Sequence, residues 1–192
     1  MVAPILEPAV EVLWVLLPPY VASATATIPR GRGPPMDGSR SWSRDGRRLL
    51  GPSKTWSGFL FGSLFAFPIA LLEAGLILLA PPSLAIVPEY GPSVLASIPV
   101  ALLLTFGAMT GDALGSFVKR RLDRPSGARM LLLDQLPFVL LPVGLGLLLF
   151  PATFDAAFLS VAGLFWLLVY TLALHAAFNW VGYWVGLKKV PW

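Results

Sequence analysis

The residues best suited to chemistry in this sequence lie in two short strings, 45–58 and 111–121, and at the nearby Asp134. The first string, DGRRLLGPSKTWSG, combines two arginines, a lysine, glycines and hydroxyl side chains directly before an apolar segment. Backbone N–H groups at a helix start, with Lys and Arg beside them, form a natural phosphate site. We therefore expect phosphate binding by Arg47, Arg48, Gly51, Lys54, Thr55 and Ser57.

A structural interpretation of the first string stays open at this point. A basic cluster beside a membrane span can simply set the topology and contact anionic lipid, without binding a substrate. A P-loop, in contrast, is excluded. Its consensus places a glycine directly before Lys-Thr, whereas two residues separate Gly51 from Lys54 and no hydrophobic strand precedes the string.

The second string predicts a helix with one polar face. On that helix Asp112, Ser116 and either Lys119 or Arg120 would lie together, because they are spaced by one and two turns. A carboxylate near a membrane edge is costly unless it is paired or binds a metal. With Asp134 at a similar depth, two carboxylates among bases suit Mg²⁺ held between protein and substrate phosphates. The structural alternative is an internal ion pair between Asp112 and a loop base.

The elements that must position these residues are membrane helices. The chain has 192 residues, of which 56% are hydrophobic and only 12% are charged. A helix needs about 20 apolar residues to cross a hydrocarbon core of roughly 30 Å. We therefore predict an all-α integral membrane protein, one polytopic membrane domain over residues 1–192. Its five expected transmembrane helices are 4–28, 58–80, 93–118, 132–150 and 158–187.

The basic residues predict the orientation of the chain in the membrane. All fourteen Lys and Arg residues lie in the windows 30–54, 119–129 and 188–189. The positive-inside rule makes these regions cytoplasmic and places the N-terminus outside and the C-terminus in the cytoplasm. The expected cytoplasmic segments are loop 29–57, loop 119–131 and tail 188–192. Because the pI of 9.8 reflects loop charge, we expect no nucleic-acid partner.

The three chemical segments are expected at one depth of the membrane. Asp112 is nineteen residues after Ser93, roughly 28 Å along a helix, which places it at the cytoplasmic edge of the hydrocarbon core. Asp134 opens the fourth predicted span at that edge, and Lys54 immediately precedes the second. Four basic residues are expected only to set the orientation of the chain in the membrane: Arg30, Arg32, Lys188 and Lys189.

Other polar residues are given no chemical role. His175 is the chain's one histidine, and we interpret it as a structural residue satisfied by a neighbouring helix. Glu73 lies about 15 Å or more from the depth of His175 and is assigned no function. The sequence has no cysteine, which excludes disulfides and thiolate chemistry. The N-terminus lacks the basic region of a cleaved signal peptide.

The two strings together resemble the membrane CTP-transferase group, which includes bacterial and eukaryotic CDP-diacylglycerol synthases. The resemblance is carried by Lys-Thr-Trp-x-Gly at 54–58 and Gly-Asp-x-x-x-Ser-x-x-Lys-Arg at 111–120. The chain departs from the longer signature of those enzymes, because it lacks the Pro-x-His-Gly-Gly that follows. The chain instead resembles the archaeal branch, the CDP-archaeol synthases, in lacking this segment, in its short length and in the run Asp-Gly-Arg-Arg-x-Leu-Gly at 45–51.

The resemblance implies a reaction and roles for the residues. CMP would pass from CTP to an ether-lipid phosphate, 2,3-bis-O-geranylgeranyl-sn-glycerol 1-phosphate, giving a CDP-archaeol-type lipid and pyrophosphate. Asp112 and Asp134 would hold Mg²⁺ and, with Lys54, form the catalytic set. The expected phosphate-binding residues are Arg47, Arg48, Gly51, Lys54, Thr55, Ser57, Ser116, Lys119 and Arg120. The active site would face the cytoplasm at the cell membrane, the partners would be CTP, the lipid phosphate and the bilayer, and a homodimer is left open.

Three alternatives remain at this stage. The chain could be a CDP-diacylglycerol synthase acting on phosphatidic acid, or a small non-enzymatic transporter or assembly protein whose basic loops only orient it. A CDP-alcohol phosphotransferase is the third. Asp37-Gly38 begins the motif of that family, but Arg40 is misplaced in it and the two later aspartates are absent.

Overall fold

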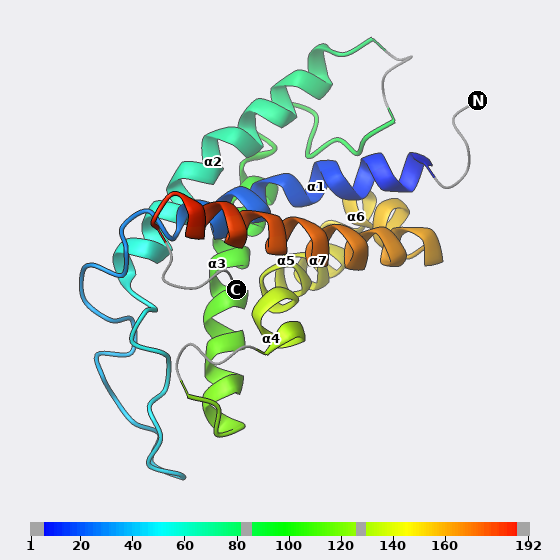
Figure 1. Ribbon diagram of the computed structural model, residues 1–192. Helices are drawn as coiled ribbons and strands as arrows, with labels where there is room; N and C mark the ends of the chain where they lie inside the picture. Colours follow the sequence, from blue (N-terminus) through cyan, green and yellow to red (C-terminus); the bar gives the residue numbers. More distant parts are fainter. Residues whose placement is uncertain (1–5, 82–85, 126–129, 188–192) are drawn as a thin grey trace.

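The structure is a computed structural model that describes residues 6–81, 86–125 and 130–187. These residues form a bundle of helices, and no strand is present among them (Figure 1). The helices are α1 (Leu6–Thr25), α2 (Trp56–Leu79), α3 (Ile98–Arg121), α4 (Leu131–Gln135), α5 (Pro137–Leu149), α6 (Pro151–Phe158) and α7 (Val161–Trp184). The predicted all-α class is confirmed. The predicted cytoplasmic tail 188–192 lies outside the described residues.

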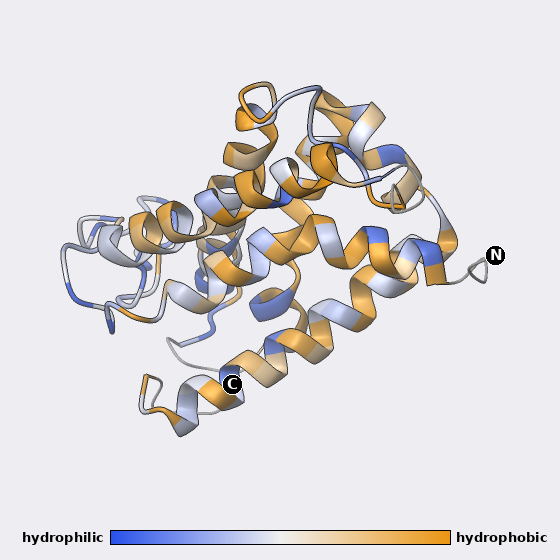
Figure 2. Ribbon diagram, turned by 90° about the horizontal axis from the view of Figure 1, so that it is seen from above, coloured by the Kyte–Doolittle hydropathy of each residue, from blue (hydrophilic) through white to orange (hydrophobic). Residues whose placement is uncertain are grey.

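Four helices, α1, α2, α3 and α7, are long and apolar enough to cross a membrane. Apolar residues cover most of the helical surface, whereas hydrophilic residues concentrate in the segment between α1 and α2 (Figure 2). On α2, for example, Leu64 and Leu72 are 58% and 61% exposed, which suits contact with lipid and not with water. The chain is therefore a multi-pass membrane protein.

The fourth predicted span, 132–150, is not one continuous helix. It is divided at Leu136 into the short α4 and the 13-residue α5. The break occurs because Pro137 has no N–H to continue the helical bonding, whereas its fixed φ suits the first position of a new helix. Pro151 opens α6 in the same way. At roughly 20 Å, α5 is shorter than the apolar core that a single straight span must cross.

Glycines bring the helices into close contact. A β-carbon built on Gly62 of α2 would stand 2.6 Å from the carbonyl oxygen of Ala22 in α1. One built on Gly111 of α3 would stand 2.1 Å from the carbonyl oxygen of Pro137 at the start of α5. Real side chains do not tolerate such distances, so only glycine permits these helix crossings. Through them α2 packs against α1, and α3 packs against α5.

The polar segment between α1 and α2 is an ordered loop. Its two arms pair through backbone hydrogen bonds, from Trp42 N to Arg47 O at 2.7 Å and from Leu49 N to Arg40 O at 2.9 Å. The turn between them is closed by Gly46, whose φ of 68° is readily adopted only by glycine. The first part of the loop returns to its last part at the hydrogen bond from Met36 N to Lys54 O, 2.9 Å long, just before α2 begins.

Candidate active site

A cavity of about 650 Å³ lies where the loop between α1 and α2 meets the bundle. Its lining comes from α1, this loop, the start of α2, the last turns of α3, α4 with the start of α5, and α7. Most of the residues predicted to bind phosphate or metal line it. They are Gly51, Lys54, Thr55, Asp112, Ser116, Lys119, Arg120 and Asp134.

Lys54 and Asp112 form the first of two ion pairs on the cavity lining. The Lys54 ammonium lies 2.5 Å from the Asp112 carboxylate, and the two side chains are 26% and 28% exposed. The position of Lys54 follows from the helix start beside it. Thr55 is the N-cap of α2 and its hydroxyl accepts from Gly58 N at 3.3 Å, so the lysine is held directly in front of that helix.

Lys119 and Asp134 form the second pair, also at 2.5 Å. The other carboxylate oxygen of Asp134 accepts from Met130 N at 2.8 Å, which holds the side chain at the start of α4. Close approach of α3 to α4 makes the pair possible. A β-carbon on Gly115 would lie only 2.8 Å from the carbonyl oxygen of Leu133.

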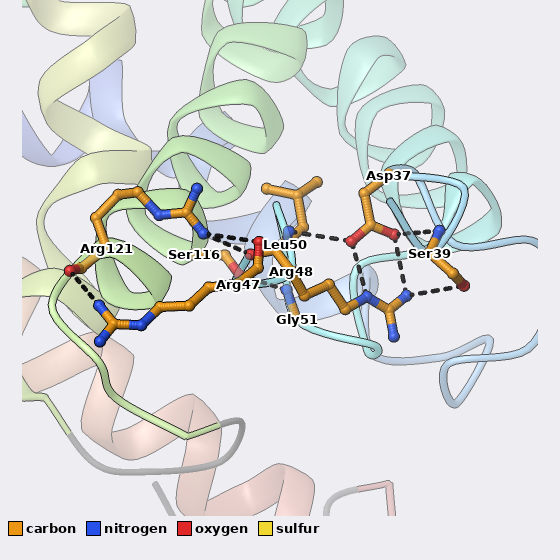
Figure 3. A network of polar contacts seen from close by, with 8 residues as sticks. All are labelled: Asp37, Ser39, Arg47, Arg48, Leu50, Gly51, Ser116 and Arg121. Atoms are coloured by element: carbon orange, nitrogen blue, oxygen red, sulfur yellow. Dashed lines mark hydrogen bonds and ion pairs between the residues drawn. The ribbon is translucent and has the colours of Figure 1, made fainter. Parts of the chain in front are cut away.

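A third contact joins the loop to α3 between the two pairs. The backbone N–H of Gly51 donates to the Ser116 hydroxyl at 3.0 Å (Figure 3). Ser116 is one helical turn after Asp112 and almost one turn before Lys119, so this bond fixes the loop at the height of both ion pairs. The predicted common face of α3 is therefore present, and each of the two lysines is paired with an aspartate from another segment.

Arg47, Arg48 and Ser57 were predicted to bind phosphate but do not line the cavity. Arg48 makes two hydrogen bonds to Asp37, at 2.8 and 3.0 Å, and Arg47 lies 3.2 Å from Asp123. The Ser57 hydroxyl donates to the carbonyl oxygen of Arg32. These contacts stabilise the loop itself, so the role of the three residues in phosphate binding stays a prediction.

Asp37 is the centre of the loop's polar network. Its side chain is 1% exposed and accepts from Arg48, from Leu50 N at 3.0 Å and from Ser39 N at 3.0 Å (Figure 3). The hydrogen bonds from Arg48 lower the pKa of this carboxyl to about 2, against the opposing effect of burial. The sequence had indicated only a poor match to another family's motif at this position. Asp37 is instead the charged residue around which the loop folds.

Arg121 was missed by the sequence analysis. Its guanidinium donates to the carbonyl oxygens of Arg48, at 2.7 Å, and Arg47, at 3.3 Å (Figure 3). It lies 4.9 Å from the ring centre of Phe117 and 5.6 Å from that of Trp42, a cation–π arrangement. The available signal was a third base next to Lys119 and Arg120, which had been interpreted only as part of a basic window.

Comparison with known proteins decides the family. A family model described as CarS-like, CDP-archaeol synthase, matches residues 5–192. The chain belongs to the CDP-archaeol synthase family. The family that the sequence motifs indicated is thus confirmed.

Individual members of this family match along nearly their whole length. The CDP-archaeol synthase of Thermococcus gammatolerans is 36% identical over 180 residues, which cover 94% of each chain. That of Methanosphaerula palustris is 40% identical over 177 residues, covering 92% of this chain and 100% of the relative. A solved structure, reported as "Structural insight into an intramembrane enzyme for archaeal membrane lipids biosynthesis", superposes with a TM-score of 0.63 at 31% identity. It covers 88% of this chain and 93% of the solved one.

The carboxylates of this CDP-archaeol synthase family member fit Mg²⁺ bound together with phosphates. Within residues 6–81, 86–125 and 130–187 no group of three or more His, Cys, Asp or Glu side chains is placed to hold a metal ion. Asp112 and Asp134 therefore offer two oxygen donors and not a full coordination shell. Mg²⁺ commonly takes one or two carboxylates and completes its shell with water and substrate phosphates.

In this member of the family α1 and α7 also contribute to the cavity lining. The Tyr20 hydroxyl and the Thr171 hydroxyl share a buried hydrogen bond of 3.1 Å. His175, expected to be satisfied by another helix, contacts Asn179 of its own helix at 3.0 Å. Its ring centre lies 5.7 Å from that of Phe138, and all three residues line the cavity. Glu73 is not among the lining residues and accepts from Tyr90 at 3.0 Å.

Proposed function

We propose that this chain transfers CMP from CTP to 2,3-bis-O-geranylgeranyl-sn-glycerol 1-phosphate, giving a CDP-archaeol-type lipid and pyrophosphate. Membership of the CDP-archaeol synthase family supports the reaction. The observation that carries the proposal is the pair of Lys–Asp contacts on one cavity, Lys54 with Asp112 and Lys119 with Asp134. Three separate segments of the chain, the loop before α2, α3 and α4, converge there, which a loop that only sets topology does not require.

The reaction needs charge neutralisation more than it needs a general base. A phosphate monoester has a second pKa of about 6, so the lipid phosphate is largely ionised near neutral pH and can attack directly. One of its oxygens forms a bond to the α-phosphorus of CTP, and the bond from that phosphorus to the β-phosphate oxygen breaks, releasing pyrophosphate. The barrier lies in bringing two polyanions together, and fixed cations such as Lys54, Lys119 and Arg120 lower it.

We propose Mg²⁺ as the cofactor, with Asp112 and Asp134 as its protein ligands. When bound, the ion supplies positive charge to the phosphates at the reacting centre. Lys54 and Lys119 contact the two carboxylates at 2.5 Å. Once those carboxylates are shared with a cation, the two ammonium groups are placed to bind phosphate oxygens, with Gly51 and Thr55 beside them.

We propose five membrane crossings, with α5 returning the chain between α3 and α7. The direction of α7 supports this count. It runs beside α1 and in the same direction (Figure 1), and residues beyond the Tyr20–Thr171 contact on both helices line the cavity. If α1, α2, α3 and α7 were the only crossings, α7 would run antiparallel to α1. The short α5, continued by α6, supplies the missing return.

The basic windows orient the proposed bundle in the cell membrane. The loop between α1 and α2 and the last turn of α3 carry Lys54, Lys119 and Arg120, which all line the cavity, so the cavity marks the basic end of the proposed bundle. The positive-inside rule assigns this end to the cytoplasm, where CTP is available. The N-terminus is then outside and the C-terminus cytoplasmic.

The test of the proposed function is synthesis of the product by the purified protein. The protein would be incubated with labelled CTP, Mg²⁺ and either the geranylgeranyl ether-lipid phosphate or phosphatidic acid. We expect labelled CDP-lipid from the ether lipid at the higher kcat/KM. Faster reaction with phosphatidic acid would reassign the substrate, and no CDP-lipid from either lipid would refute cytidylyl transfer.

A further inference from the structure

Arg30 is a base of the cavity lining that lies outside both Lys–Asp pairs. It follows the end of α1, where its backbone N–H donates to Thr27 O at 2.9 Å. Both residues belong to the lining of the cavity, together with Gly31. The sequence had placed Arg30 among the residues that serve topology alone, so its position beside the candidate active site requires another explanation.

The charge balance of the cavity gives that explanation. Among residues 6–81, 86–125 and 130–187, the lining includes four basic residues, Arg30, Lys54, Lys119 and Arg120, and two acidic residues, Asp112 and Asp134. Each lysine is neutralised by its aspartate at 2.5 Å. The two arginines therefore carry the net charge of +2 that four bases and two acids leave.

The proposed substrates need that uncompensated charge. A phosphate monoester alone carries about −1.5 to −2 near neutral pH, and the triphosphate of CTP adds further negative charge. Lys54 and Lys119 each lie beside a carboxylate, whereas the two arginines lie outside both Lys–Asp pairs. Arg120 comes from α3, next to Lys119, whereas Arg30 comes from the loop that follows α1. The two arginines therefore approach the cavity from different elements.

We infer that Arg30 forms a phosphate-binding subsite at the α1 side of the cavity, which takes a substrate phosphate group. This inference rests on the proposed cytidylyl transfer. A guanidinium binds phosphate through two parallel charge-assisted hydrogen bonds, which a lysine ammonium cannot reproduce. Tyr20, Ser23 and Ala24 of α1 also line the cavity, and so does Thr27 in the turn between α1 and Arg30.

Two phosphates have the required chemistry, the monoester of the lipid and the triphosphate of CTP. Separate KM values for the two substrates distinguish them. Arg30→Gln removes the charge and keeps much of the length of the side chain. Because Arg30 has a φ of 55°, glutamine meets the same backbone restriction as arginine. The matched control is Arg32→Gln, which removes an equal charge two residues later, outside the cavity lining.

We expect Arg30→Gln to raise one of the two KM values by roughly tenfold, the effect of losing one charge-assisted hydrogen bond. Arg30→Lys would recover part of the loss, and Arg32→Gln would match the wild type. A higher KM for the lipid identifies the monoester as the ligand, and a higher KM for CTP identifies the triphosphate. If Arg30→Gln leaves both KM values within twofold of the wild type, the subsite does not exist.

A second measurement keeps the inference separate from the proposed function. Binding of CTP and of the lipid phosphate to the wild type and to Arg30→Gln would be measured without turnover, and thermal unfolding would check that both proteins are folded. Weaker binding of either ligand by the folded variant supports the subsite. Equal binding of both ligands refutes it, even if the wild type is active. A wild type that makes no CDP-lipid refutes the proposed function instead.

Discussion

The ammonium of Lys54 lies 2.5 Å from the carboxylate of Asp112 and joins the loop before α2 to the third helix of the bundle. The two residues are 58 positions apart in the chain. The contact brings together the two sequence strings, 45–58 and 111–121, that indicated a CTP-dependent enzyme. It also makes each residue dependent on the other, because removal of one leaves the other charge uncompensated near a membrane edge.

The Lys54–Asp112 pair predicts strongly non-additive kinetics. Lys54→Gln and Asp112→Asn should each lower kcat/KM by about 100-fold or more, the range for a lost charge-stabilising group. The double variant should be little worse than the poorer single variant, because the residues act as a unit. Asp155→Asn is the matched control, since Asp155 is exposed on α6 and does not line the cavity. Independent, additive losses would show that the two residues do not share one function.

The contact of Gly111 with Pro137 predicts a stability effect with an internal control. Gly111→Ala would place a methyl group 2.1 Å from the Pro137 carbonyl oxygen and force α3 away from α5. We expect a loss of about 1–3 kcal/mol in stability and a lower rate, because Asp112 follows directly. Gly144→Ala in α5 meets no atom within 4 Å and should be neutral or slightly stabilising. Thermal unfolding in detergent would compare the two, and equal effects would contradict the packing.

The site was predictable from the sequence where its residues share a helix or directly precede one. Asp112, Ser116 and Lys119 lie one turn apart on α3, and Lys54 stands beside a helix start, so local spacing placed them. Contacts between residues far apart in the sequence were harder to predict. No spacing rule pairs Arg48 with Asp37 or Arg121 with the carbonyl oxygens of the loop, because those contacts depend on how the loop folds.

Hydropathy alone predicted which segments of the chain form the long apolar helices. Apolar length identified α1, α2, α3 and α7, but it treated 132–150 as one span. The effect of Pro137 was missed because a proline can also kink a continuous helix, and only packing against α3 decides between a kink and a break. Arg30 was assigned to topology for a related reason. Its charge is visible in the sequence, but its place on the cavity depends on the end of α1 lying next to α3.

Arg121 is predicted to position the loop over α3. Its guanidinium binds two loop carbonyl oxygens and contacts Trp42, so Arg121→Ala should loosen the segment that carries Lys54. We expect a roughly tenfold higher KM for CTP with a smaller change in kcat. Arg121→Lys should restore little of the loss, because an ammonium lacks the forked geometry. A general loss of structure would instead lower the unfolding temperature and leave the KM of the folded fraction unchanged.

Arg124→Ala is the control for the Arg121 variants. Arg124 is exposed three residues later and is not part of the cavity lining. Its removal should leave both KM and kcat close to the wild-type values. If Arg124→Ala and Arg121→Ala changed the KM for CTP equally, the effect would belong to the charge of the basic window and not to the position of the loop.

The Asp37–Arg48 contact predicts how stability depends on pH. Since the pKa of Asp37 is lowered to about 2, the contact contributes fully above the unfolded-state value of about 3.9. The contribution is lost as the pH falls from about 4 through 2. Asp37→Asn should therefore unfold at a lower temperature than the wild type at pH 7, and the difference should narrow at pH 3. The same difference at both pH values would contradict the assignment.

The central claim is that Asp112 and Asp134 serve one Mg²⁺-dependent cytidylyl transfer. The most direct measurement is the initial rate of labelled CDP-lipid formation from CTP and the ether-lipid phosphate by the wild type, Asp112→Asn and Asp134→Asn, with Mg²⁺ and with EDTA. The wild type should be active with Mg²⁺ and inactive with EDTA, and each variant should be slower by about 100-fold or more. Either variant within threefold of the wild type, or full wild-type activity in EDTA, would contradict the claim.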